Sequence, residues 1–257
     1  MRPEENQLVV DIEEGNLAHH EAQSLLELMP NYYSWTYGKF KNILHGDVIE
    51  IGCGAGLGIG NYLHQVSHVY AVDYNDELLR RIANTYPADR VTTVKADLRG
   101  GWKELEGLHG DAVIMMDVLE HFADDADFFS KAAGLVKPGG HLIVKVPAQS
   151  ALYSEMDQAS GHFRRYDAGG LRKLAQASNL RTVRLSPINP VGGLAYRFKN
   201  KNKTNFSKSF SPAQLKLINA FIPLIALFDM LPFLPGLSIV GVFQRPLGKA
   251  GSTEIRS

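Results

Sequence analysis

The sequence predicts a doubly wound α/β fold on a mostly parallel sheet, and three observations lead to that prediction. Short apolar runs alternate with helical stretches over residues 47–147, glycines and aspartates directly follow the first runs, and a Lys-Pro-Gly-Gly turn precedes the fifth run. This alternation implies right-handed crossovers, which cover both faces of a parallel sheet with helices.

Seven runs are predicted as strands, at residues 47–51, 69–73, 91–95, 112–116, 141–147, 182–185 and 238–244. Helices are predicted over 76–86 after the N-cap Asn75, over 125–136, and over 168–177 after the possible cap Asp167. In an open parallel sheet, ligands bind beyond the carboxyl ends of the strands. The informative residues are therefore expected just after each strand.

The composition is that of an ordinary globular protein. Of its 257 residues 45% are hydrophobic and 21% charged, which predicts one large domain with a sizeable core. Cys53 is the only cysteine, which excludes an intrachain disulfide and favours a reducing compartment. The acidic N-terminal segment lacks the basic region and apolar run of a signal peptide. We therefore expect a cytoplasmic protein.

A formal net charge of zero hides a strong asymmetry. Residues 1–167 carry 25 acidic and 14 basic side chains, whereas residues 168–257 carry 13 basic and 2 acidic ones. No acidic residue occurs between Asp167 and Asp229. The basic part is either a solvated face or a contact surface for an anionic partner such as phosphate, nucleic acid or a lipid headgroup.

Glycines cluster directly after the first predicted strand, in Gly52-Cys53-Gly54-Ala55-Gly56. Glycine lets the backbone turn sharply and approach a ligand where a Cβ atom would collide. The loop does not contain the G-x-G-x-x-G spacing of dinucleotide-binding proteins, so a pyrophosphate cradle is not predicted.

Aspartates follow at the ends of the next two predicted strands. Asp73 lies 21 residues beyond Gly52, where a carboxylate can accept both hydroxyls of a ribose. Asp97 and Leu98 pair an acceptor with an apolar side chain, which suits the amino group and ring of adenine. Three such features on successive strands predict a nucleoside-binding edge of the sheet.

These motifs form an ordered set that resembles class I S-adenosylmethionine-dependent methyltransferases over about residues 47–147. The set is Glu50-x-Gly52-x-Gly54-x-Gly56, Asp73, Asp97, Asp117-Val118-Leu119-Glu120-His121 and Lys137-Pro138-Gly139-Gly140. The resemblance implies a seven-stranded sheet whose last strand is antiparallel, with S-adenosylmethionine as the cofactor. The implied cofactor residues are Tyr33, Glu50, Gly52, Cys53, Gly54, Gly56, Asp73, Tyr74, Asp97, Leu98, Met116 and Asp117.

Within that set, the resemblance implies that the glycine loop contacts the methionine part of the cofactor, Asp73 the ribose and Asp97 the adenine, flanked by Tyr74. Met116 and Asp117 are implied to lie near the methionine amino group. The upstream run 32–35, Tyr-Tyr-Ser-Trp, resembles the aromatic helix that lids the cofactor in many relatives. The alternative is that these aromatic residues are simply core.

A second motif, Gly161-His162-Phe163-Arg164-Arg165-Tyr166, resembles the G-H-x-R-R-Y motif of a bacterial subgroup acting on small molecules. Arg164, Arg165 and Tyr166 are therefore predicted to bind the substrate, because guanidinium groups clamp carboxylates or phosphates through charge-assisted bonds. The structural alternative pairs an arginine with the acidic segment 124–127, and we favour that alternative for one of the two arginines.

The chemistry of methyl transfer asks for in-line placement of the acceptor and exclusion of water, and for a base where the nucleophile is protonated. His121 and His162 are the predicted bases. No bound metal is predicted, although Asp117, Glu120, His121 and His162 offer a ligand set that suits a divalent ion and resembles some metal-assisted methyltransferases.

We divide the chain into a helical lid (1–46), a cofactor-binding α/β core (47–186), an inserted cap (187–236) and a last strand with a tail (237–257). The insertion combines a basic run at 197–203 with an apolar helical stretch at 215–231, in which Lys216, Asn219, Pro223 and Asp229 argue against a bilayer span. A cap over the substrate cleft and an interfacial helix on anionic lipid are the two interpretations.

The sequence thus predicts a methyltransferase acting on an oxygen, nitrogen or carbon of a small metabolite or glycoconjugate. The alternatives are a lipid-linked acceptor at a membrane surface and a non-catalytic cofactor-binding scaffold. Nucleic acid is not expected as a partner, because no Asn-Pro-Pro-Tyr-type loop follows the fourth strand.

Overall fold

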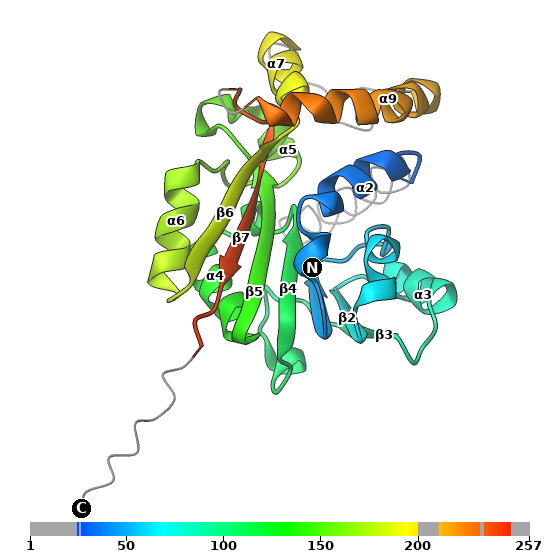
Figure 1. Ribbon diagram of the computed structural model, residues 1–257, viewed down its shortest axis with the longest axis vertical. Helices are drawn as coiled ribbons and strands as arrows, with labels where there is room; N and C mark the ends of the chain where they lie inside the picture. Colours follow the sequence, from blue (N-terminus) through cyan, green and yellow to red (C-terminus); the bar gives the residue numbers. More distant parts are fainter. Residues whose placement is uncertain (1–24, 26, 200–210, 232–233, 248–257) are drawn as a thin grey trace, which may run out of the picture.

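A computed structural model describes residue 25 and residues 27–199, 211–231 and 234–247. Its centre is a seven-stranded sheet in the order β3-β2-β1-β4-β5-β7-β6 (Figure 1). All neighbours pair in parallel except β7, which runs antiparallel to both β5 and β6. The strands are β1 (Asp47–Ile51), β2 (His68–Asp73), β3 (Val91–Lys95), β4 (Gly110–Met116), β5 (Val136–Pro147), β6 (Arg181–Ile188) and β7 (Ser238–Gln244).

Helices cover both faces of this sheet, as the alternating sequence pattern predicts. The α-helices are α2 (Pro30–Gly38), α3 (Asp76–Thr85), α4 (Asp125–Gly134), α5 (Glu155–Ala159), α6 (Ala168–Ala177), α7 (Pro190–Lys199) and α9 (Pro212–Ile225). The 3-10 helices are η1 (Lys41–Ile43), η2 (Ile59–Asn61), η3 (Leu63–Gln65), η4 (Lys103–Leu105), η5 (Leu119–His121), η6 (Ser150–Leu152) and η7 (Ala226–Met230).

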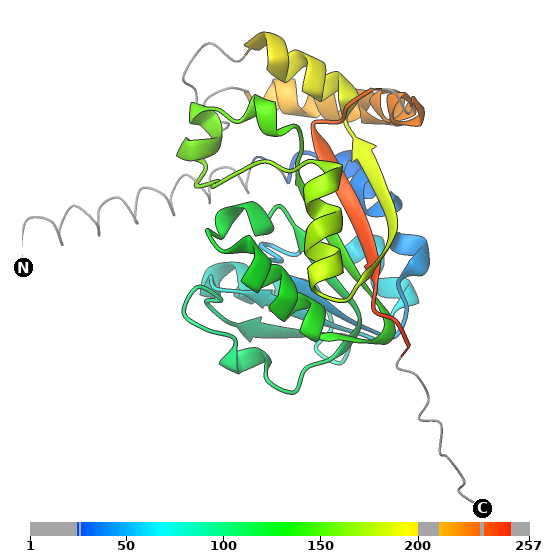
Figure 2. The ribbon, with the colours of Figure 1, turned by 90° about the vertical axis from the view of Figure 1, so that its left-hand side faces the viewer.

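The core is divided by the sheet into two apolar layers. Ile49 and Ile51 of β1 pack in the layer that α4 and α6 cover, whereas Val48 packs in the layer that α2 and α3 cover. Figure 2 shows α4 and α6 side by side on the near face of the sheet. Successive side chains of a strand point to opposite faces, so the continuous apolar run of β1 reflects burial on both.

Most predicted boundaries agree with the structure. Helix α3 begins after Asn75, whose side chain accepts hydrogen bonds from the amides of Glu77 and Leu78. Asp167 is the N-cap residue of α6, as predicted, but its carboxylate accepts a hydrogen bond from the Ser150 hydroxyl at 2.6 Å and none from the helix amides. Strand β5 begins earlier than predicted, at Val136, because Val136 already pairs with Gly110 of β4. The Lys-Pro-Gly-Gly segment forms an irregularity within the strand, where Gly139 has a left-handed φ of 84°.

The insertion forms α7, α9 and η7, which lie across the carboxyl ends of the parallel strands (Figure 1). Helix α9 packs on α2 through the buried side chains Leu215 and Ile222. Asn31 donates two hydrogen bonds to Asn219, from its backbone amide at 2.9 Å and from its side chain at 3.0 Å. Asp229 of η7 accepts a hydrogen bond from the Trp35 indole at 2.7 Å. Polar residues of the apolar stretch therefore attach it to α2.

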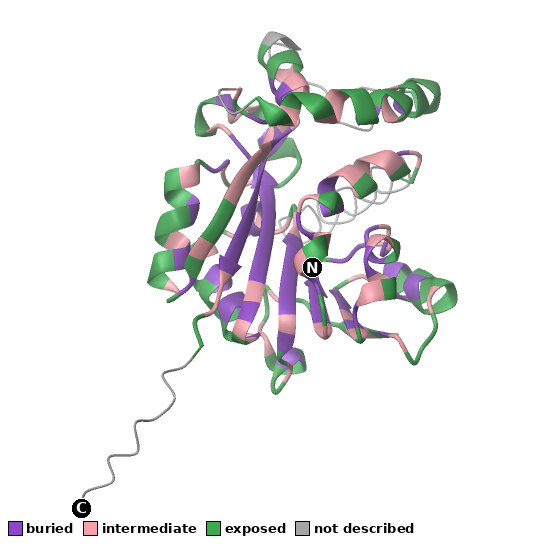
Figure 3. Cartoon of the chain, viewed as in Figure 1, coloured by how far each residue is buried: buried purple, intermediate pink, exposed green. Residues whose placement is uncertain are grey.

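The opposite side of α9 and η7 is exposed (Figure 3). Among the described residues, the segment Pro212–Met230 is long and apolar enough, by length and composition alone, to cross a bilayer. Only 11% of its most apolar stretch is buried inside the protein. The large apolar side chains that it exposes are Leu217, Phe221, Leu224, Leu227, Phe228 and Met230.

Candidate functional site

A cleft of about 560 Å³ opens at the carboxyl ends of strands β1 to β5. Its position follows from the topology, because the strand order reverses between β1 and β4 and leaves a crevice there. Of the residues predicted for the cofactor, those that line the cleft are Tyr33, Glu50, Gly52, Cys53, Gly54, Asp73, Tyr74, Asp97, Leu98, Met116 and Asp117. The two predicted bases, His121 and His162, line it as well.

The polar groups of the cleft follow the order of the strands. Asp97 comes after β3, Asp73 ends β2, Gly54 lies in the loop after β1, Asp117 follows β4, and Lys145 is on β5. Neighbouring strands lie about 4.8 Å apart, so these five positions are spread over roughly 19 Å of the sheet edge. An elongated ligand with several polar groups fits such a row.

The glycine loop brings bare backbone to the cleft. Gly52 and Gly54 adopt left-handed φ angles of 66° and 54°. At Gly52 a Cβ atom would lie 2.4 Å from a side-chain carbon of Val118, so only glycine fits. Gly56 is different, because its Cβ position would meet Ile82 of α3 and the cleft does not reach it. Gly56 therefore has a packing role against α3, and its predicted contact with the cofactor stays a prediction.

Asp73 is held rigidly by the backbone of two loops. Its Oδ2 accepts the Gly54 amide at 2.9 Å and its Oδ1 accepts the Asn75 amide at 3.0 Å. The residue is only 7% exposed, and each carboxylate oxygen keeps a lone pair for a further donor. The geometry therefore offers one oxygen to each hydroxyl of a diol.

Asp97 is more engaged than its sequence position indicates. Its two carboxylate oxygens accept hydrogen bonds from Nε and Nη2 of Arg99 at 2.8 and 2.9 Å. These bonds from Arg99 lower the pKa of Asp97 and keep the carboxylate ionised. The Arg99 guanidinium also lies over the Tyr74 ring, 5.2 Å from its centroid. Asp97 remains a candidate acceptor for adenine, but its oxygens are shared.

Glu50 anchors the aromatic helix to the sheet. Its carboxylate accepts hydrogen bonds from the hydroxyls of Tyr37 and Tyr62, and burial raises its pKa. Helix α2 also contributes Tyr32 and Tyr33 to the cleft wall. Burial raises the pKa of Tyr33, so this phenol stays neutral. The aromatic segment is thus both core and cleft wall, and its role as a lid over the cofactor stays a prediction.

Two opposite charges lie side by side at the methionine end predicted for the cleft. Asp117 has a left-handed φ of 55°, and its carboxylate forms an ion pair with the ammonium group of Lys145. Burial would lower the pKa of Lys145, but the neighbouring Asp117 raises it, so the lysine is charged. Sequence reasoning missed Lys145, although a lysine within the otherwise apolar run 141–147 was a visible signal.

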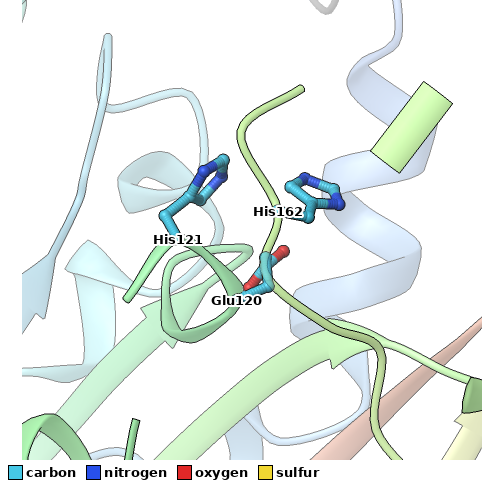
Figure 4. A group of neighbouring side chains, drawn as sticks. All are labelled: Glu120, His121 and His162. Carbon is cyan, nitrogen blue, oxygen red and sulfur yellow. The ribbon is translucent and has the colours of Figure 1, made fainter. Parts of the chain in front are cut away.

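The two histidines face each other at one end of the cleft, with ring centroids 4.8 Å apart (Figure 4). His162 is held by Asp157 of α5, whose Oδ1 lies 3.2 Å from its Nδ1. Burial alone would raise the pKa of Asp157, but hydrogen bonds from His162 and Arg165 lower it to about 2. Asp157 was not predicted, because no motif or periodic segment marks residues 148–160.

None of the three residues predicted as the substrate clamp lines the cleft, and each has a partner within the protein. Arg164 pairs with Asp125 at 2.5 Å, which is the alternative pairing that the sequence left open. Arg165 is buried and donates from Nε to both oxygens of Asp157, at 2.9 and 3.0 Å. The Tyr166 hydroxyl donates to the backbone carbonyl of Leu119 at 3.3 Å. These residues build the wall behind the histidines.

The inserted cap contacts the border of the cleft rather than its interior. Tyr196 of α7 lies 4.5 Å from the Arg165 guanidinium and 2.6 Å from the Ser154 hydroxyl. Helix α9 packs on α2, whose inner side lines the cleft. Of the described residues of 187–236, none lines the cleft itself. The described part of the insertion therefore contacts α2, which lines the cleft, and residues 154 and 165 beside it.

Comparisons with known proteins agree with this architecture. Residues 19–185, more than half of the chain, match a family described as a methyltransferase domain. A probable S-adenosylmethionine-dependent methyltransferase of Mycolicibacterium smegmatis is 27% identical over 137 residues, which are 51% of each chain. A ubiquinone biosynthesis O-methyltransferase of Xylella fastidiosa is 33% identical over 103 residues, 38% of this chain and 40% of the relative.

The chain thus spans about half the length of the curated relatives that it matches. Among solved structures, an S-adenosylmethionine-dependent methyltransferase from Archaeoglobus fulgidus superposes with a TM-score of 0.55 at 14% identity, over 84% of this chain and 94% of that one. At that identity the likeness concerns the fold. Because the family match covers most of the sheet and the whole glycine loop, the chain belongs to the methyltransferase-domain family.

Proposed function

We propose that this chain transfers a methyl group from S-adenosylmethionine to an oxygen, nitrogen or carbon nucleophile of a small-molecule acceptor. One observation carries the proposal, which is the row of polar groups along the sheet edge from Asp97 to Lys145. The names of the relatives support the same cofactor and reaction.

The residues of the row match the parts of this cofactor in order. Leu98 and Tyr74 provide apolar surface for adenine, and the Asp73 oxygens suit the ribose diol. Lys145 and Asp117 place a cation beside an anion, which complements the carboxylate and ammonium of a free amino acid. When bound, the cofactor supplies a methyl group on a sulfonium, which is already electrophilic.

The acceptor enters, in this proposal, at the end of the cleft where His121 and His162 meet. Phe122 and Phe128 also line the cleft with stacked rings, and this apolar surface helps to exclude water from it. Asp157 holds Nδ1 of His162, so Nε2 of that ring is left as the acceptor of a proton. His162 is therefore a better oriented candidate base than His121.

The test is binding followed by turnover. Calorimetry of the full chain with S-adenosylmethionine is expected to show one site, and mass spectrometry of metabolite mixtures is expected to show a gain of one methyl group in an acceptor. No binding would overturn the proposal. Binding without transfer to any acceptor would favour the non-catalytic scaffold instead.

A second candidate function, methyl transfer to a lipid-linked acceptor at a membrane surface, is favoured by the exposed side of α9 and η7. Leu217, Phe221, Leu224 and Phe228 recur at a spacing of three or four residues and form one apolar stripe, all at least 43% exposed. The surrounding sequence from 168 to 228 has ten basic and no acidic residues. An apolar stripe in a part of the sequence that is rich in basic residues suits the interface of an anionic bilayer.

Co-sedimentation with vesicles of phosphatidylcholine and phosphatidylserine tests this candidate. We expect binding at low salt, weakened by salt and by the double substitution Phe221→Ser/Leu224→Ser. Leu247→Ser is the control, because Leu247 is even more exposed than Phe221 and Leu224 but lies after β7, away from the stripe. Absence of binding at low salt, or equal loss in the control, would leave the insertion as a cap alone.

A further inference from the structure

We propose that Glu120, His121 and His162 form a binding site for a divalent transition-metal ion at the acceptor end of the cleft. One ligand atom from each of the three side chains lies within 4.8 Å of the other two. In Figure 4 the Glu120 carboxylate lies below the two imidazole rings, in the gap between them. Ligands of a tetrahedral ion with bonds of about 2.1 Å lie about 3.4 Å apart, so a small inward movement of the side chains closes the site.

The backbone holds the two contributing segments together. Glu120 and His121 end the short helix η5, and His162 lies in the loop after α5. The amide of Phe163 donates to the Glu120 carbonyl at 2.8 Å, and the amide of His162 donates to the Asp157 carbonyl at 2.9 Å. The three side chains are therefore brought together by fixed backbone contacts rather than by chance surface proximity.

Glu120 provides the strongest indication of a cation. Its side chain is 0% exposed, and neither carboxylate oxygen has a hydrogen-bond partner among the described residues. Buried carboxyl groups normally have partners, because an unsatisfied one costs free energy. A bound cation would supply the missing partner and stabilise the ionised form.

His162 has the support that metal-binding histidines commonly show. Its Nδ1 is held by the Asp157 carboxylate, which leaves Nε2 for an ion. Asp157 is itself fixed by Arg165 and accepts a hydrogen bond from Tyr196 at 3.2 Å. A carboxylate behind the imidazole sets its tautomer and orientation, and such partners affect metal affinity by about 10- to 100-fold.

The geometry narrows the ligand set that the sequence offered. Asp117 is left out of the ligand set, because its carboxylate is paired with Lys145 and the three groups that lie within 4.8 Å of one another do not include it. Two imidazoles and one carboxylate suit Zn²⁺, Mn²⁺, Fe²⁺ or Co²⁺ rather than Ca²⁺ or Mg²⁺, which favour oxygen ligands. Three protein ligands leave at least one coordination position open, as in catalytic metal sites.

A metal ion at this site determines which chemical class of acceptor is methylated, an inference that rests on the proposed methyl transfer. An acceptor hydroxyl bound at the open position has a lowered pKa, so its O–H bond breaks and the proton passes to solvent. The oxygen keeps the electron pair and forms the new O–CH₃ bond as the S–CH₃ bond of the sulfonium breaks, which leaves a neutral thioether. In the metal-loaded protein, the histidines act as ligands and the acceptor is a hydroxyl compound.

Metal binding is measured on the full chain without any cofactor. We expect one Zn²⁺ per chain by calorimetry, and a Co²⁺ complex with visible absorption bands that Zn²⁺ displaces. Glu120→Gln, His121→Gln and His162→Gln are each expected to weaken Zn²⁺ binding by at least tenfold. Two variants are the controls. One is His64→Gln, at an exposed position, and the other is His19→Gln/His20→Gln, which removes two consecutive histidines near the N-terminus.

Glu120→Gln also separates binding from folding, because the amide resembles the neutral acid in shape. We expect it to leave the melting temperature of the metal-free chain unchanged or higher and to abolish the rise caused by Zn²⁺. Unchanged Zn²⁺ affinity in the three ligand variants, or its loss in the His19/His20 control, would overturn the site. Intact Zn²⁺ binding without any methyl transfer would overturn the acceptor role and the proposed function, but not the site.

Discussion

The two halves of the cleft hold their polar side chains in different ways. In the half assigned to the cofactor, Asp73 is held by the backbone amides of Gly54 and Asn75, all within 21 residues of one another. In the half assigned to the acceptor, Asp157 is held by the side chains of Arg165, His162 and Tyr196. One half is built from strand ends and the other from a network of buried side chains.

This difference has an energetic consequence. A carboxylate held by backbone amides keeps free lone pairs for a ligand, so its removal is expected to affect binding more than folding. A carboxylate that neutralises a buried guanidinium is part of the folded structure, and its removal leaves an unpaired charge. The first half is therefore a ligand site on a stable sheet, whereas the second contributes to stability itself.

The largest effect is expected from Asp157→Asn. Arg165 would remain buried without its counter-charge, and breaking a buried ion pair costs about 3–5 kcal/mol. Urea unfolding at neutral pH measures this loss. Asp167→Asn, which changes an exposed carboxylate only ten residues away, is the control and is expected to cost less than about 1 kcal/mol. Similar losses of unfolding free energy in both variants would contradict the difference drawn between the two halves of the cleft.

Asp73→Ala is expected to affect binding more than stability. Loss of both diol acceptors would weaken S-adenosylmethionine binding by ~2–4 kcal/mol, whereas Asp73→Asn keeps one acceptor oxygen and would lose less. Calorimetry measures both affinities, with circular dichroism to confirm folding. Asp97→Ala is the comparison, and we expect a smaller loss because Arg99 already occupies its oxygens. Wild-type affinity in Asp73→Ala would refute the ribose assignment.

The fall in the free energy of unfolding at acid pH gives a third test. The pKa of Asp157 is about 2 in the folded protein, below its ordinary value of 3.8, so the contribution is present above pH ~4 and is lost as the pH falls through about 2. The shift corresponds to about 2 kcal/mol. The free energy of unfolding of Asp157→Asn, measured from pH 6 to pH 2, is expected to fall less steeply than that of the wild type. Parallel curves would contradict the assignment.

The smallest effect is expected at Arg164. Its ion pair with Asp125 is partly exposed, and such pairs contribute less than about 1 kcal/mol. Arg164→Met is therefore expected to leave both stability and S-adenosylmethionine affinity nearly unchanged. Arg165→Met is expected to lower the free energy of unfolding several times more than Arg164→Met does. Thermal unfolding of the two neighbouring variants compares them directly. A larger loss at Arg164 would reverse the roles assigned here.

The fold could be predicted almost completely, because its signals are local. β7 has the predicted bounds Ser238–Gln244 and α6 the predicted bounds Ala168–Ala177. Apolar runs of strand length, separated by helical stretches, leave few alternatives to a parallel sheet. The exceptions are element ends and capping contacts. Asp167, for example, accepts a hydrogen bond from the Ser150 hydroxyl and none from the amides of α6.

The cofactor half of the site was also accessible to sequence reasoning. A parallel sheet brings the ends of its strands to one edge, so residues that follow strands are neighbours whatever their separation in the chain. Gly56 is the exception, since a glycine can serve packing as well as ligand approach, and the spacing alone does not distinguish them. Lys145 was missed because its burial and its pairing with Asp117 depend on the neighbouring strand.

The sequence by itself determined which residues follow the strands, and with them the glycine loop, Asp73 and Asp97 as neighbours along one edge of the sheet. The tertiary structure alone decided which polar groups are satisfied. Arg165 and Asp157 neutralise each other, Arg164 turns to Asp125, and Glu120 is buried without a partner among the described residues. The physical reason is that strand ends follow from local periodicity, whereas the partner of a buried charge depends on contacts between distant segments.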